Sequence, residues 1–248
     1  MSDSQPSLAR ALVTARRVAV MTGAGISAES GVPTFRDADG LWEGRRPEEV
    51  ATPEAFAADP VMVWEFYDAR RANLARCRPN AGHRALARLE SIVPELTLVT
   101  QNVDGLHQLA GSTGVHELHG NIWRLRCERE CGVDREDRRV PLPRPLPPPC
   151  PCGARLRPGV VWFGEPLPPA PFAAAERAAR RAELFLVVGT SGVVEPAASL
   201  ARIAHSAGAR VVEINPRETA LSSVAHDRLR ETAATALPRL VEPGDPSP

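Results

Sequence analysis

The feature that most constrains the fold is an alternation of short apolar runs with helix-like segments along most of the chain. Four apolar runs have the length and composition of buried strands: residues 17–21, 97–100, 184–189 and 210–214. Helical patterns lie between them, at residues 60–76, 80–90, 171–182 and 196–208. Because strands that alternate with helices build parallel sheets covered on both faces, the sequence predicts an α/β fold with a doubly wound, Rossmann-like parallel sheet.

Residues 123–159 break this alternation, since they contain four cysteines and a proline-rich run at 141–151. We expect one domain over residues 1–248 with smaller modules inserted into it. Its expected parts are a core at 10–45, 92–122 and 160–240, a helical insert at 46–91, a cysteine module at 123–159 and a disordered tail at 241–248.

The four clustered cysteines form two pairs, Cys127 with Cys131 and Cys150 with Cys152, and 18 residues separate the pairs. Four thiolates spaced in this way favour one tetrahedral Zn²⁺ in a zinc-ribbon-like module. No open coordination position or nearby base is evident, so the predicted metal is structural. Two disulfides are the alternative, which a cytosolic protein disfavours. We expect Cys77 to take no part.

Composition narrows the partners and the chemistry. The formal net charge is zero, so nothing indicates a nucleic-acid or membrane partner. The N-terminus lacks the apolar stretch of a secretory signal, and no apolar run reaches membrane-spanning length, so we expect a cytoplasmic protein. The sequence contains no lysine, which excludes a lysine nucleophile or a Schiff-base mechanism.

A glycine-rich segment, residues 23–28, follows the first strand and leads into a helix expected to begin near Ser27. It fits G-x-G-x-x-G/A, a pattern in which glycines let backbone N–H groups approach a pyrophosphate. Dinucleotide-binding dehydrogenases also have an acidic residue at the end of a second strand, and here residues 30–42 form a loop instead. A plain strand-to-helix turn is the alternative.

Further motifs make the pattern specific. Residues 23–36, 100–104, 117–120, 160–165, 189–191 and 213–216 resemble the signature segments of the sirtuin family, in the family's order. The resemblance covers roughly residues 10 to 240. It implies an NAD-dependent protein-lysine deacylase that binds acylated-lysine proteins or peptides and releases nicotinamide and O-acyl-ADP-ribose. We expect such an enzyme to be a monomer.

The resemblance assigns the chemistry to residues that follow predicted strands. Asp104 would hold the nicotinamide carboxamide, and Asn102 would order the nicotinamide ribose and its water. A capping turn is the alternative for both. His119 would act as general base on a ribose hydroxyl. His116 and His119 lie three residues apart near a strand end, so alternation predicts that they face opposite ways.

The same resemblance implies a longer list of NAD-binding residues: Gly23, Ala24, Gly25, Ser27, Phe35, Arg36, Trp42, Gln101, Asn102, Asp104, Gly189, Thr190, Ser191, Asn215, Pro216, Arg217 and Ala233. Phe35 would lie beside the nicotinamide, and Arg36 and Ser191 would meet phosphates. Asn215 and Glu213 would meet the adenosine ribose, and Ala233 the adenine.

The substrate site is expected in two segments. Val160, Val161, Phe163 and Gly164 would belong to a strand, residues 160–165, to which the peptide adds as a further strand. An ordinary core strand is the alternative.

Tyr67 and Arg70 share a helical face, and spacing alone favours core packing for the first and a solvated face for the second. The resemblance instead identifies a Tyr-x-x-Arg pair typical of sirtuins that remove acidic acyl groups. A guanidinium pairs with the terminal carboxylate of a succinyl or malonyl group, and acetyl-lysine should be a weaker substrate.

Three other functions compete with this interpretation. A mono-ADP-ribosyltransferase would use the same displacement of nicotinamide with another acceptor. A plain deacetylase would lack the acidic-acyl preference. A non-catalytic NAD-sensing or zinc-ribbon module would not need His119 and Asn102, which are both present.

Overall fold

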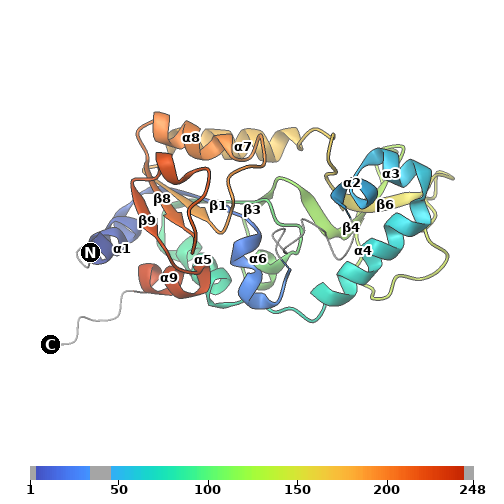
Figure 1. Ribbon diagram of the computed structural model, residues 1–248, viewed down its shortest axis with the longest axis horizontal. Helices are drawn as coiled ribbons and strands as arrows, with labels where there is room; N and C mark the ends of the chain where they lie inside the picture. Colours follow the sequence, from blue (N-terminus) through green and yellow to red (C-terminus); the bar gives the residue numbers. More distant parts are fainter. Residues whose placement is uncertain (1–3, 34–45, 243–248) are drawn as a thin grey trace.

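The central element of the computed structural model, which describes residues 4–33 and 46–242, is a six-stranded parallel sheet (Figure 1). The strands lie in the order β3-β2-β1-β7-β8-β9. Their bounds are β1 Arg17–Thr22, β2 Glu95–Thr100, β3 Val115–Glu117, β7 Leu184–Val188, β8 Arg210–Ile214 and β9 Asp227–Leu229. The chain first builds outward from β1 in one direction and then, from β7, in the other. The predicted doubly wound Rossmann-like sheet is therefore confirmed.

Helices cover both faces of this sheet, and its central strands β1, β7 and β8 are buried along nearly their whole length (Figure 1). Helices α1 (Ser4–Thr14), α5 (Ala81–Ile92) and α9 (Ala233–Val241) pack on one face. Helices α7 (Pro169–Arg181) and α8 (Ser199–Ser206) pack on the other. Side chains of β1 alternate between the two faces: Val18 and Val20 pack against α1, α5 and α9, while Ala19 and Met21 pack on the face covered by α7 and α8.

A second, smaller lobe lies at one end of the molecule (Figure 1). It combines a three-stranded antiparallel sheet of order β5-β4-β6 with three helices. The bounds are α2 Pro47–Val50, α3 Pro53–Ala58, α4 Pro60–Leu74, β4 Gly120–Cys127, β5 Asp134–Glu136 and β6 Leu156–Val160. One apolar cluster joins these helices to this sheet, so the helical insert and the cysteine module form a single packed unit. The short helix α6 (Leu106–Leu109) also contributes a side chain to that cluster.

Three local expectations differ from the structure. Helix α5, inside the range expected for the insert, packs on the six-stranded sheet through Leu86 and Leu89. The helix expected near Ser27 is replaced by two 3₁₀ turns, Ala24–Ile26 and Ala28–Ser30.

The strand expected at 160–165 ends at Val160, because the chain turns back there. The Glu165 N–H donates to the Trp162 carbonyl at 3.1 Å, and Gly164 has a φ of +86°. The segment beyond Val160 is therefore a turn.

The described helices include none that is long and apolar enough to cross a membrane. The expected disordered tail lies mostly outside the described residues, which end at Glu242, just after α9.

Two buried charged side chains fix helix α4 to residues 137–142 of the same lobe. Asp68 accepts a hydrogen bond from the Leu142 N–H at 2.9 Å. Arg71 is fully buried, donates to the carbonyls of Asp137 and Arg139, and lies 3.6 Å from the Asp137 carboxylate. Because an unpaired buried charge is costly, these contacts fix both the rotation and the position of α4.

We expect Arg71→Met to destabilise the protein by about 1–3 kcal/mol, since it removes the donor to the buried Asp137 carbonyl, while the Asp137 carboxylate keeps its pair with Arg139. The surface variant Arg180→Met removes an exposed pair with Glu176 and should cost less than about 1 kcal/mol. Chemical denaturation of both variants gives the comparison. Equal losses of unfolding free energy would show that Arg71 does not anchor the helix.

Candidate active site and metal centre

Two glycine loops meet at the carboxyl ends of β1 and β7, where the winding of the sheet reverses. The Gly25 N–H donates to the Gly189 carbonyl at 2.8 Å. A Cβ on Gly25 would lie 2.7 Å from that oxygen, and one on Gly189 would lie 2.5 Å from the Ile26 nitrogen. Gly189 also has a φ of +61°. Side chains are therefore excluded from this contact, and bare backbone lines the position where doubly wound sheets bind ligands.

Asn102 follows β2 and reaches across to the first glycine loop. Its Nδ2 donates to the Gly23 carbonyl at 3.1 Å and to Ser27 Oγ at 3.3 Å. Its own N–H is held by Thr100 Oγ1 at 3.0 Å. Within residues 4–33 and 46–242, the side-chain oxygen of Asn102 accepts no hydrogen bond.

Asp104 is a buried carboxylate with a fixed orientation. Ser27 Oγ donates to its Oδ2 at 2.7 Å, and the Leu106 N–H donates to its Oδ1 at 2.9 Å. Trp123 Nε1 donates to its backbone carbonyl at 2.8 Å. Burial raises the pKa of Asp104, and these side-chain hydrogen bonds act in the opposite direction.

A histidine that the sequence interpretation did not assign supports this carboxylate. The Asn80 N–H donates to Nδ1 of His83, so the ring proton is on Nε2, 3.3 Å from Ser27 Oγ. The hydrogen bonds therefore run in one direction, from His83 to Ser27 to Asp104. Burial lowers the pKa of His83 to about 4 and keeps the ring neutral.

A second unassigned histidine, His107, lies beneath the site. Its Nε2 is 2.9 Å from Thr22 Oγ1, which also donates to Thr100 Oγ1 at 2.8 Å. Burial lowers the pKa of His107 to about 3. This neutral ring ties α6 to the ends of β1 and β2. Neither histidine belongs to a recognisable motif, and the only sequence signal was the helix cap formed by Asn80 and His83.

His119 lies in the turn between β3 and β4, so the expected alternation with His116 along one strand is wrong. Its Nδ1 is 2.9 Å from the Gln101 carbonyl, which can only accept. The proton therefore sits on Nδ1, and Nε2 carries the basic lone pair. Burial lowers the pKa of the half-buried His119, so the ring is neutral at pH 7.

Thr190 connects the remaining loops at this edge. Gln101 Nε2 donates to its Oγ1 at 3.1 Å, and Asn215 Nδ2 donates to its carbonyl at 3.0 Å. The Arg217 N–H donates to Asn215 Oδ1 at 3.2 Å. The segments after β1, β2, β7 and β8 thus form one continuous rim.

Other expected residues take different positions around this rim. Ser191 is half-buried, Pro216 is exposed, and Ala233 is the buried first residue of α9. The expectation that Glu213 meets a ligand is wrong, because it is fully buried and bound by Ser222 and Arg230. Three expected NAD-binding residues lie outside the described residues: Phe35, Arg36 and Trp42.

The expected acyl-binding pair lies on α4. Tyr67 and Arg70 are both buried, and the Tyr67 hydroxyl accepts a hydrogen bond from Trp162 Nε1 at 3.0 Å. Burial raises the pKa of both Tyr67 and Asp104. The positive charge of Arg70 partly offsets this rise in each case. Spacing alone predicted a solvated face for Arg70, but Arg70 is buried, and its charge acts on Asp104 in the rim.

The segment 160–164 connects the smaller lobe with the turn that carries His119. Val160 pairs with Gly120, where a Cβ would lie 2.2 Å from the Gly159 carbonyl, so the glycine after His119 is required. The Val161 N–H donates to the His119 carbonyl at 2.8 Å. Phe163 and Gly164 are exposed.

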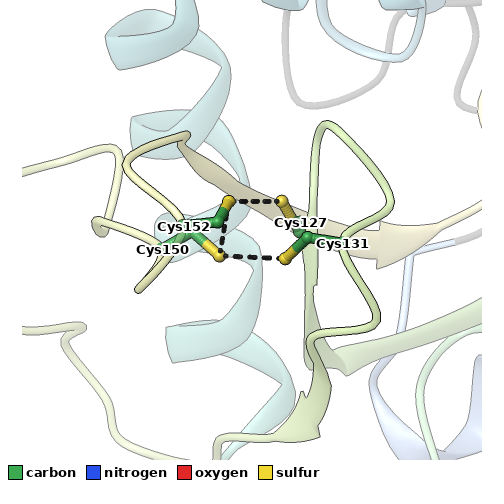
Figure 2. A group of neighbouring side chains, drawn as sticks. All are labelled: Cys127, Cys131, Cys150 and Cys152. Atoms are coloured by element: carbon green, nitrogen blue, oxygen red, sulfur yellow. Dashed lines mark hydrogen bonds between the residues drawn. The ribbon is translucent and has the colours of Figure 1, made fainter.

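The four cysteines converge as expected from both ends of the module (Figure 2). All four Sγ atoms lie within 4.8 Å of one another, and three of the separations are 3.5–3.6 Å. Disulfide sulfurs would be about 2.05 Å apart, so the disulfide alternative is not adopted. A tetrahedron with Zn–S bonds of about 2.3 Å has edges of about 3.8 Å, so these thiols fit one zinc ion.

Known proteins resemble the chain along nearly its whole length. The Sir2 family model matches residues 23–196. The NAD-dependent protein deacylase of Aquifex aeolicus is 53% identical over 225 residues, which cover 91% of this chain and 94% of the relative. An NAD-dependent protein deacylase of Thermus thermophilus is 52% identical over 239 residues, with 94% and 92% covered.

Solved structures agree with these relatives. The complex of a Sir2 homologue with NAD is 44% identical, with a TM-score of 0.89, and the match covers 98% of this chain and 93% of that one. A mutant Sir2 with a p53 peptide and NAD is 32% identical, with a TM-score of 0.85 and coverages of 97% and 98%.

By fold, the chain is a Rossmann-like protein with an inserted four-cysteine module. It belongs to the Sir2 family, since the family model covers more than half of its residues and relatives above 50% identity span nearly all of it.

We expect the purified protein to carry one Zn²⁺ per chain, bound by Cys127, Cys131, Cys150 and Cys152. Cys131→Ser should lose the ion and lower the melting temperature, because a structural zinc contributes folding free energy. Cys77→Ser is the matched control, since Cys77 lies outside the cluster. Elemental analysis and thermal unfolding test this, and full zinc content in the Cys131→Ser protein would contradict it.

Proposed function

We propose that the protein is an NAD-dependent protein-lysine deacylase that prefers acidic acyl groups such as succinyl or malonyl. The observation that carries the deacylase function is the neutral imidazole of His119, with Nε2 as its base, held by the carbonyl of Gln101, which precedes the fixed Asn102 in the chain. Relatives named NAD-dependent protein deacylase and a Sir2 homologue complex with NAD support it.

NAD supplies, when bound, an ADP-ribosyl group that gives up nicotinamide and accepts the acyl group from lysine. The bare backbone at Gly25 and Gly189 gives the phosphates room to approach, with Ser191 beside them. Asn215, Arg217 and Ala233 would line the adenosine end. Phe35, Arg36 and Trp42 remain assignments from the sequence.

Asp104 would position the nicotinamide carboxamide, because its carboxylate is held by Ser27 and the Leu106 N–H. Asn102 would order the nicotinamide ribose and a water molecule through its side-chain oxygen. The Asp104 carboxylate and the fixed backbone dipoles would stabilise positive charge on that ribose without reorganisation.

His119 would remove a proton from a ribose hydroxyl. The Gln101 carbonyl holds the proton on Nδ1, so the ring always presents Nε2 as the base. The Val161 N–H bond to the His119 carbonyl also fixes the peptide-binding segment relative to this ring. An acylated peptide would lie along Val160, Val161, Phe163 and Gly164, and main-chain pairing would make little demand on its sequence.

Tyr67 and Arg70 would recognise the end of the acyl chain. A buried guanidinium forms strong, charge-assisted hydrogen bonds with a carboxylate, and the phenol adds another. Plain deacetylation is the competing specificity, and it would leave the Arg70 charge without a substrate partner. We expect the enzyme to act as a cytoplasmic monomer on acylated proteins or peptides, without nucleic-acid or membrane partners.

We expect His119→Ala to lower turnover by about 10²–10⁴-fold while NAD binding persists, because the substitution removes only the general base. Deacylation of an acyl-lysine peptide and calorimetric NAD binding give the two readouts. Turnover near that of the unmodified enzyme would remove His119 from this role.

The pH profile of the unmodified enzyme is a second check on the same residue. Burial lowers the pKa of His119 below its usual 6.5, and the base works only when neutral. The rate should therefore be level near pH 7 and fall only as pH drops through that lowered pKa. A rate already falling with pH between 8 and 7 would contradict the assignment.

We expect Arg70→Met to lower desuccinylation efficiency by about tenfold to a hundredfold, since a hydrogen bond to a charged group is worth roughly 1.5–3 kcal/mol. Deacetylation should change little, and Tyr67→Phe should act in the same direction more mildly. The measurement is the ratio of the two efficiencies. Arg76→Met, exposed just beyond the end of α4, is the control. An unchanged ratio in Arg70→Met would reject the acidic preference and leave the deacylase function standing.

A further inference from the structure

The contact between Tyr67 and Trp162 has a fixed direction. Trp162 Nε1 lies 3.0 Å from the Tyr67 hydroxyl oxygen, and both side chains are buried. An indole N–H can only donate, so the phenol oxygen must be the acceptor in this bond. The phenol's own proton therefore points away from the indole.

That phenol proton is available for a ligand. Among residues 4–33 and 46–242, the Tyr67 hydroxyl donates to no group. Burial raises the pKa of Tyr67 to about 12, so the hydroxyl keeps its proton at any working pH. Arg70 follows one helical turn later, and its charge acts on the same phenol. A proton donor and a cation thus stand together, which is the pairing that a carboxylate requires.

The indole itself is held on several sides. The guanidinium of Arg157 stacks 3.5 Å from its centroid, and the ring of Phe56 lies 5.3 Å away. The backbone N–H of Trp162 donates to Glu165 Oε2 at 2.8 Å, and Arg157 forms a two-pronged ion pair with the same carboxylate. The direction in which Nε1 points is therefore set by the turn beyond β6.

We propose that Trp162 is a positioning residue for acyl specificity, whose N–H holds the Tyr67 phenol so that its O–H is directed at the terminal carboxylate of a dicarboxylic acyl chain beside Arg70. This inference rests on the proposed acidic-acyl function. Accepting one hydrogen bond also strengthens a hydroxyl as a donor in the next, so the indole contributes to binding through Tyr67 without touching the substrate.

The test compares desuccinylation with deacetylation in Trp162→Phe, which keeps an aromatic ring and removes the donor. The succinyl-to-acetyl efficiency ratio should fall about twofold to tenfold, mainly through a higher KM for the succinyl peptide. Trp64→Phe is the matched control. It removes a buried indole donor to the Leu156 carbonyl on the same helix as Tyr67, and its ratio should equal that of the unmodified enzyme.

A double variant separates positioning from general damage. In a Tyr67→Phe background, Trp162→Phe should cause no further fall in the ratio, because the hydroxyl that it orients is gone. Site-specific replacement of Trp162 by benzothienylalanine preserves the shape and stacking of the ring and removes only the N–H. It should give the same fall, and it replaces the phenylalanine variant if that one does not fold.

The outcomes distinguish this inference from the function on which it rests. A ratio lowered by Arg70→Met and Tyr67→Phe but unchanged by both Trp162 replacements overturns the positioning role alone. Equal losses on both substrates, or a further fall in the double variant, also overturn it. No succinyl preference in the unmodified enzyme, with an unchanged ratio in Arg70→Met, overturns the acidic-acyl function itself.

Discussion

The whole site depends on one close approach of backbone to backbone, between Gly25 and Gly189. It joins the loop after the first strand to the loop after β7, at the point where the sheet changes its direction of winding. Because no side chain fits there, only peptide groups line this contact at the strand ends. The side chains of Asn102 and Asp104 are held next to it by hydrogen bonds to Gly23 and Ser27. The geometry of the candidate site is thus a consequence of sheet topology and of two glycines that carry no Cβ atom.

The sequence predicted what periodicity and strand order determine. Apolar runs predicted four of the six parallel strands, and paired cysteines predicted the thiol cluster, because both signals are local. They did not predict the two edge strands, β3 and β9, which are only three residues long and carry polar residues. The sequence did not place His83 or His107, since a buried neutral histidine has no local pattern and its role depends on which distant loop it meets. It also extended the strand beyond Val160, because the Glu165 contact that turns the chain is invisible in apolar residues alone.

The second lobe links the metal cluster to the proposed acyl pocket through a single helix. Asp68 and Arg71 fasten one side of α4 to the segment between the cysteine pairs. Tyr67 and Arg70 occupy neighbouring positions on the same helix, so any shift of the cysteine module moves them as well. A metal held by the four cysteines would therefore help to fix the position of the helix that carries Tyr67 and Arg70.

The outermost strands of the large sheet, β3 and β9, are each only three residues long. Edge strands this short expose few unpaired peptide groups, so two copies of the sheet can form few hydrogen bonds with each other edge to edge. Short edge strands of this kind thus protect the large sheet against edge-to-edge aggregation.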